Sequence, residues 1–279
     1  MYSNFEKNCI ELISGMPKKR SRHCFRSALR HLELADRLIE VDPAMAIFRG
    51  ITAEEKAASG LMFALRELKY PGADRIKPHN HVHKHALFPF VKIVGLFFGQ
   101  VLKDKMKEYR LHIKDEDGKQ RLMLAFPMQI AGKDQWAYPI PPLNIGIKVG
   151  KTGMPPSYRS QITEFLAAKG AKNVSSYLKK EANLRNEILY AAPSGYPEVV
   201  TLKPEFLREK GSHVMVLLQA YLMIAPYKEL QPYVQDAVEA FASMVGTLEN
   251  AQPTPAEANP SLKRSANGRP HENTSRIPS

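Results

Sequence analysis

The stretch DPAMAIFRGITAEEKAASGLMFALREL, residues 42–68, decides the fold of this chain. Asp42 followed by Pro43 is typical of a helix start, because an aspartate side chain caps free backbone N–H groups and proline suits the first helical position. Apolar side chains then recur at steps of three and four along one helix face: Ile47, Ile51, Ala58, Leu61, Leu65 and Leu68. The stretch therefore predicts one long helix over residues 43–69, ended by Pro71-Gly72.

Helical patterns also dominate on both sides of this stretch. They predict helices over residues 23–40, 157–191, 204–225 and 228–248. Within residues 86–102 only Lys92 and Gln100 are polar, so we expect a buried core helix there. The run 214–225 is almost as apolar and predicts a central helix packed on all sides.

The period of the pattern changes near residues 105–150. Tyr109, Leu111 and Ile113 alternate with polar residues, and Asp117-Gly118 then marks a tight turn before a second apolar run. This pattern predicts a β-hairpin, to which residues 144–149 add a third strand. The expected fold class is mainly α, a helical bundle with a small, basic β insertion.

Composition divides the chain into a folded body and a tail. The chain has 279 residues, 44% of them hydrophobic, and a formal net charge of +12. From residue 251 onward Pro, Asn, Ser and Thr dominate and no apolar periodicity remains, so too little surface is available for burial. We therefore expect a helical domain over 1–250 and a disordered tail over 251–279, with most of the positive charge on the domain.

Several classes of protein are excluded by what the sequence lacks. The two cysteines cannot form a disulfide framework, and no secretion signal is recognisable, so we expect a cytoplasmic protein. The apolar run 86–102 is shorter than the ~20 residues of a membrane span, so no membrane partner is expected. The phosphate loop, the G-x-S-x-G elbow, H-E-x-x-H and paired CxxC motifs are also absent.

The densest chemical signal is the run KPHNHVHKHALFPF, which places histidines at every second position: His79, His81, His83 and His85. In an extended segment these side chains point to one side, where they could converge on zinc, copper or nickel. The alternatives are a polar loop whose histidines cap a helix beginning near Pro89, and a basic loop facing RNA or another partner.

Glu54 is the second anomaly, because it falls on the apolar face of the helix over 43–69. A carboxylate in a core is costly unless it is paired or hydrogen-bonded. Arg185 shares a helical stripe with apolar residues in the predicted helix 157–191, so we expect it at the core edge as a partner for Glu54. The pair is either a structural ion pair or part of a functional site.

The segment Ala53-Glu54-Glu55-Lys56-Ala57-Ala58, with the late Arg185-Asn186 pair, resembles the helical HEPN group, and within it the abortive-infection AbiV type. The resemblance covers residues 23–69 and 172–191. It implies an RNA-directed protein of bacterial or phage defence, in which Arg185 stabilises phosphate charge beside Asn186 and Glu54. The catalytic histidine of that group would fall at Tyr190, Ala191 or Ala192, none of which is histidine, so the resemblance implies either that Tyr190 positions a phosphate or that ribonuclease activity is lost.

Positive charge gives a separate argument for a polyanion partner. Lys18, Lys19, Arg20 and Arg22 form the sharpest basic cluster, and a body of this charge attracts RNA or other phosphate polymers. The competing hypothesis is a non-catalytic helical module that binds another protein.

Overall fold

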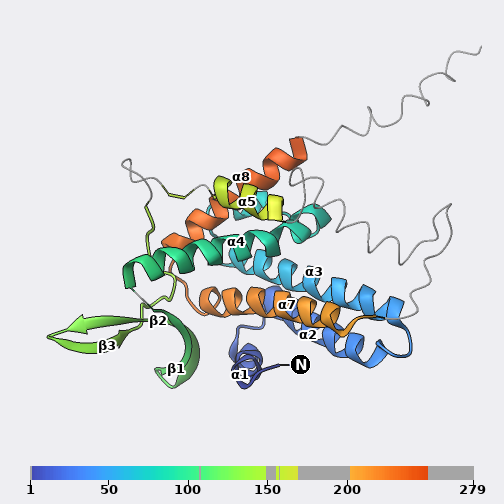
Figure 1. Ribbon diagram of the computed structural model, residues 1–279, viewed down its shortest axis with the longest axis horizontal. Helices are drawn as coiled ribbons and strands as arrows, with labels where there is room; N and C mark the ends of the chain where they lie inside the picture. The colour runs from blue at the N-terminus through green and yellow to red at the C-terminus, as the bar shows by residue number, and fades with distance from the viewer. Residues whose placement is uncertain (1, 107, 149–154, 157, 169–201, 251–279) are drawn as a thin grey trace, which may run out of the picture.

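The computed structural model describes residues 2–106, 108–148, 155–156, 158–168 and 202–250, and all structural statements below concern these residues. The chain order of the elements is shown in Figure 1. The α-helices are α1 (Asn4–Leu12), α2 (Arg20–Leu38), α3 (Pro43–Glu67), α4 (His81–Met106), α5 (Arg159–Ala168), α7 (Pro204–Ile224) and α8 (Pro232–Asn250). Two 3₁₀ turns (Ile13–Gly15 and Ala73–Arg75) and three strands complete the described elements: β1 (Arg110–Glu116), β2 (Lys119–Ile130) and β3 (Lys133–Ala137).

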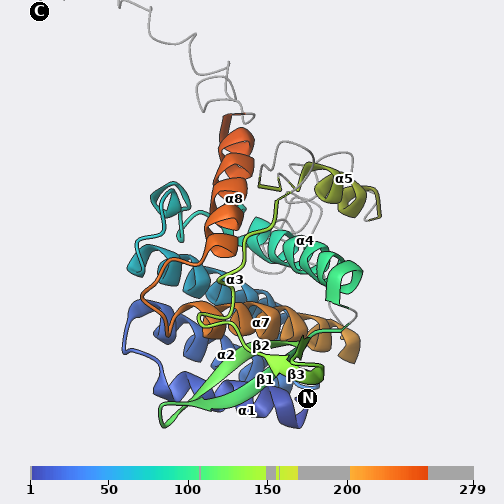
Figure 2. The same cartoon turned by 90° about the vertical axis from the view of Figure 1, so that its left-hand side faces the viewer.

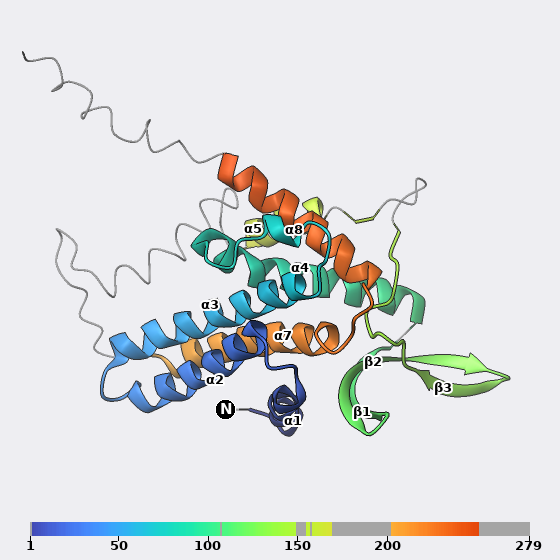
Figure 3. The ribbon, with the colours of Figure 1, turned by 180° about the vertical axis from the view of Figure 1, so that it is seen from behind.

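Helices α2, α3 and α7 lie side by side and form one layer of the molecule (Figures 1 and 3). The α2–α3 contact is close at Gly60, where a Cβ atom would meet the Phe25 ring at 2.8 Å. On its other side Phe25 packs against Tyr221 of α7, with 4.6 Å between ring centroids. The α2–α3–α7 layer therefore shares one tightly packed apolar interior.

The long helix predicted from residues 42–68 is confirmed as α3. The Asp42 side chain accepts a hydrogen bond from the Met45 N–H at 2.9 Å, as the Asp-Pro pair predicts. The helices expected over 23–40, 204–225 and 228–248 correspond to α2, α7 and α8.

Helix α1 was not among the expected elements. Its signal was present in the sequence, because Ser3 and Glu6 form a reciprocal capping box at its start.

Helices α4 and α8 form a second group against the first layer (Figure 2). The helix expected over 86–102 is confirmed as part of α4, but it is not buried all round, because Lys92, Gly95, Leu96 and Gln100 form an exposed side. It begins earlier than the expected start near Pro89, because the Asn80 side chain accepts a hydrogen bond from the Val82 N–H at 2.8 Å and starts the helix there. Pro89 thus lies inside α4.

The three strands form an antiparallel sheet in the order β1-β2-β3, within the expected insertion. The predicted hairpin is confirmed, with positive φ angles at Asp117 and Gly118 in its turn. The third strand expected over 144–149 is wrong. A second tight turn at Ala131-Gly132 instead returns the chain as β3, and the described residues 144–148 form no strand; the Asn144 N–H is bonded to the Pro141 carbonyl in a local turn.

Other predictions fall partly or wholly outside the described residues. Of the helix expected over 157–191, the structure describes α5, and residues 169–191 lie outside. The expected tail over 251–279 also lies outside. Among the described helices, none is both long and apolar enough to span a bilayer.

An apolar cavity of about 270 Å³ lies where α3, α4, α7 and α8 meet the sheet. Its wall includes Leu61, Leu87, Leu111, Met223 and Val238.

Candidate metal centre

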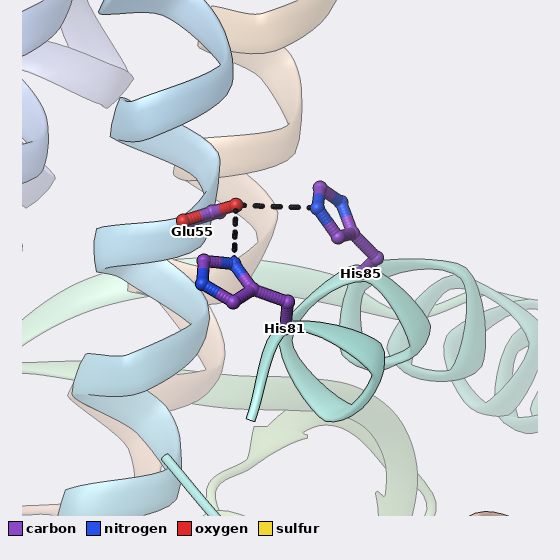
Figure 4. A group of neighbouring side chains, drawn as sticks. All are labelled: Glu55, His81 and His85. Atoms are coloured by element: carbon purple, nitrogen blue, oxygen red, sulfur yellow. Dashed lines mark hydrogen bonds and ion pairs between the residues drawn. The ribbon is translucent and has the colours of Figure 1, made fainter. Parts of the chain in front are cut away.

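Glu55 and two histidines of the 79–85 run come together between α3 and α4 (Figure 4). Glu55 is buried in the middle of α3, with 8% of its side chain exposed. His81 and His85 lie on the first turns of α4, and their spacing of four residues places both on one helix face. Their imidazoles therefore reach the same carboxylate from one side.

The distances within this group suit a metal ion. His81 Nδ1 and His85 Nε2 each lie 3.2 Å from Glu55 Oε1, and the three possible ligand atoms lie within 4.8 Å of one another. Zinc binds nitrogen and oxygen at ~2.0–2.2 Å in a tetrahedron, whose ligand atoms are then about 3.3 Å apart. The two N···O distances match an edge of that tetrahedron, and they equally fit hydrogen bonds.

Lys84 holds the other oxygen of the same carboxylate. Its Nζ donates a hydrogen bond to Glu55 Oε2 at 3.2 Å, and its side chain is 11% exposed. This contact fixes the orientation of the carboxylate and leaves Oε1 facing the imidazoles, as outer partners of metal ligands commonly do. The ammonium charge also repels a cation, so we expect weaker metal binding than at an all-protein zinc site.

The other two histidines of the run lie elsewhere. His83 is fully buried, and its Nδ1 accepts a hydrogen bond from the Lys77 N–H at 3.0 Å. His79 is exposed and lies 3.3 Å from Arg20 Nη2, beside the edge of the Phe63 ring. The expected extended segment is thus wrong: residues 81–85 are helical, and a helix separates neighbours two positions apart.

Glu54 points to a different group, between α3 and α7. Its Oε2 accepts a hydrogen bond from Lys210 Nζ at 2.7 Å and lies 3.0 Å from His213 Nδ1. Burial alone would raise the pKa of Glu54, but the hydrogen bond from His213 and the charge of Lys210 outweigh it and lower the pKa to about 2. Phe88 of α4 stacks on the His213 ring at 3.5 Å between centroids, so α3, α4 and α7 all contribute to this group.

Glu54 is buried and paired, as its position on the apolar face requires. The structure identifies Lys210 and His213 as partners that the sequence did not single out. Lys210 and His213 are three residues apart on one helix, and this spacing was the sequence signal that both could reach the same partner. The proposed partner Arg185 lies outside the described residues, as do Asn186 and Tyr190.

Glu55 and Lys84 were likewise missed as site residues. The periodicity of α3 did not reveal Glu55, because the apolar stripe passes through its neighbour Glu54. Glu54 faces α7, whereas Glu55 faces α4. The sequence signal for its partners was the H-x-x-x-H spacing of His81 and His85, which directly follows Asn80, the residue that caps the helix.

The basic cluster divides into exposed and internally bonded residues. Lys18, Lys19 and Arg20 are exposed at the start of α2. The Arg20 guanidinium lies 4.2 Å from the centroid of the Phe63 ring. Arg22 is half-buried and donates a hydrogen bond to the Met16 carbonyl, so it helps to fix the turn before α2.

Comparisons with known proteins add no family to these observations: no family model, curated protein or solved structure matches the chain.

Proposed function

We propose that this protein binds one divalent transition-metal ion through Glu55, His81 and His85. The observation that carries the proposal is the convergence of these three ligand atoms within 4.8 Å. Two imidazoles and one carboxylate form the ligand set of many catalytic zinc and non-haem iron sites.

Such an ion would supply Lewis-acid chemistry at the α3–α4 boundary. The described residues provide three ligands, and a tetrahedral ion takes four, so the fourth position goes to water, to a bound oxygen of a substrate or to a residue outside the described part. An ion held there would lower the pKa of a water bound in that position toward neutral and so would supply a nucleophile. His81 is 53% exposed, which leaves this side of the group accessible from solvent.

Metal content and metal-dependent stability test this proposal. Protein dialysed against a chelator and then against Zn²⁺ should retain about one ion per chain, and its melting temperature should rise with zinc concentration because the ion binds only the folded state. Replacing Zn²⁺ by Co²⁺ should give the visible absorption of a four-coordinate site.

The histidine run itself supplies matched variants. His81→Ala and His85→Ala should each weaken zinc binding by at least ~100-fold, whereas His79→Ala, an exposed histidine of the same run, should leave it unchanged. Absence of retained metal in the unaltered protein, or an equal loss in His79→Ala, would overturn the proposal.

A second candidate is RNA binding by a HEPN-like protein. It is favoured by the unbroken exposed run Lys18, Lys19 and Arg20 beside His79, on a chain of net charge +12. Phosphate neutralisation should make single-stranded RNA binding fall steeply with salt. Under this candidate the protein is a defence component, and Arg185, Asn186, Tyr190 and Glu54 belong to its site.

Charge reversal on the basic run tests this second candidate. Lys18→Glu/Lys19→Glu should weaken RNA binding and flatten its salt dependence, whereas Lys228→Glu, an exposed lysine after α7, should do neither. Arg185→Ala should abolish any cleavage while leaving most binding, because one cation among many contributes little to affinity. No RNA binding at low salt would exclude this candidate.

A further inference from the structure

We propose that the apolar cavity between α3, α4, α7, α8 and the sheet is a binding site for a small, uncharged, hydrocarbon-like molecule. This site is independent of the metal centre. Glu55 and His85 are absent from the cavity wall, which begins further along the same helices at Leu61 and Leu87.

The wall of the cavity determines the chemistry of the ligand. Among the described residues that form it, none carries a charge, and the only polar side chains are those of Tyr109 and Tyr233. The Tyr233 hydroxyl already donates to the Val94 carbonyl at 2.8 Å, and burial raises the pKa of this tyrosine. A charged ligand group would therefore be desolvated there without an ionic partner.

The volume determines the size of the ligand. An engineered apolar cavity of about 150 Å³ takes up benzene, so a cavity of about 270 Å³ has room for roughly ten carbon atoms. Both a fused aromatic pair of rings and a medium-length alkyl chain have this size.

We place the entrance of the cavity at Gly95. This glycine belongs to the wall and is exposed to solvent, and among the described residues a Cβ atom built on it meets nothing within 4 Å. The neighbouring Leu96 is 65% exposed, so an apolar ligand meets apolar surface there.

Direct titration with naphthalene and with decan-1-ol tests the proposal on the full chain. We expect saturable binding of one molecule per chain with a submillimolar dissociation constant, and a melting temperature that rises with ligand concentration. A solvent extract of the purified protein that contains an apolar compound in equimolar amount would count equally in favour.

Two alanines of α8 provide a matched pair of variants. Both are partly buried and packed against the core, but only Ala237 lines the cavity and Ala240 does not. Ala237→Leu should weaken binding of both probes at least tenfold, and Ala240→Leu should leave it unchanged. Gly95→Leu, at an exposed position that tolerates a side chain, should slow or block entry and gives a second test if Ala237→Leu folds poorly.

Two patterns of results would overturn the proposal. If neither probe binds or raises the melting temperature, and no apolar compound is extracted, the cavity is closed in solution or filled by residues of the chain outside the described part. Equal effects of Ala237→Leu and Ala240→Leu on probe binding would overturn it as well, because binding would then lie outside the cavity.

Discussion

Removing the Glu54 carboxylate should strongly destabilise the fold. Glu54, Lys210 and His213 have side chains only 11%, 10% and 13% exposed, and the carboxylate is the shared acceptor for both partners. In Glu54→Leu the Lys210 ammonium loses its hydrogen-bonded counter-ion within the protein. Breaking one side of a buried ion pair typically costs about 3–5 kcal/mol, so we expect a loss of that size.

Equilibrium unfolding in urea, followed by far-UV circular dichroism, measures this loss. An exposed pair on α7, the helix that carries Lys210 and His213, provides the control: Glu205 and Arg208 have side chains 69% and 66% exposed, so Glu205→Leu should cost less than about 1 kcal/mol. The double variant Glu54→Leu/Lys210→Met should be more stable than Glu54→Leu alone, because the buried ammonium that the carboxylate had balanced is then removed as well.

The reasoning fails if Glu54→Leu costs no more than Glu205→Leu. It also fails if the added Lys210→Met substitution destabilises Glu54→Leu further, because the lysine would then be held by other groups and not by this carboxylate.

Two glycine substitutions, a thiol-labelling assay and a truncation give further predictions. Gly95→Ala should stabilise the protein by about 0.5–1 kcal/mol in thermal unfolding, since Gly95 is exposed within α4 and the described residues leave open space around it. Gly60→Ala should instead cost ~1–3 kcal/mol, because the added methyl group would overpack the contact with α2. Burial raises the pKa of the Cys9 thiol to about 11, assisted by the charge of a nearby glutamate, so in a thiol-labelling assay at pH 8 it should react far more slowly in the native protein than in urea. Truncation after Asn250 should change the melting temperature by only about a degree, because the removed sequence offers little apolar surface; a larger drop would mean that it docks on the domain.

The helices and the hairpin were predictable because their signals are local. The Asp42-Pro43 start, the period of α3 and the Asp117-Gly118 turn each lie within a few residues of the structure that they specify. The third strand was misplaced because its turn, Ala131-Gly132, carries only one of the residues that favour positive φ, and alanine hides the other.

The candidate site was only partly predictable, because its geometry depends on contacts distant in sequence. His81 and His85 are four residues apart, and this spacing places them on one side of either an extended segment or a helix. The Asn80 cap decides between these two possibilities, because it starts a helix at His81. In that helix His83 lies on another face, and His79 lies before the helix begins. The Glu54–Lys210 contact joins residues 156 positions apart, and no periodicity within one helix reveals such a pair.

Glu54 and Glu55 are neighbours, yet the structure assigns them to different groups, and this leads to a final prediction about metal binding. The Glu54 carboxylate is bonded to Lys210 and lies beside His213, both on α7, so its role there is structural and a well-packed apolar pair can take its place. Glu55 contributes an oxygen that an apolar side chain cannot replace at a metal. The variant Glu54→Leu/Lys210→Met should therefore retain about one zinc ion per chain, provided that it is folded.

Glu55→Gln should give the opposite result. The amide preserves the shape of the side chain and an acceptor for Lys84, so folding should be largely retained, but a neutral amide oxygen is a much weaker zinc ligand than a carboxylate. Zinc titration followed by metal analysis should show a large loss of affinity for Glu55→Gln only. If both variants lose zinc equally while circular dichroism shows both folded, the two carboxylates act as one site, and the division between α4-facing and α7-facing groups is wrong.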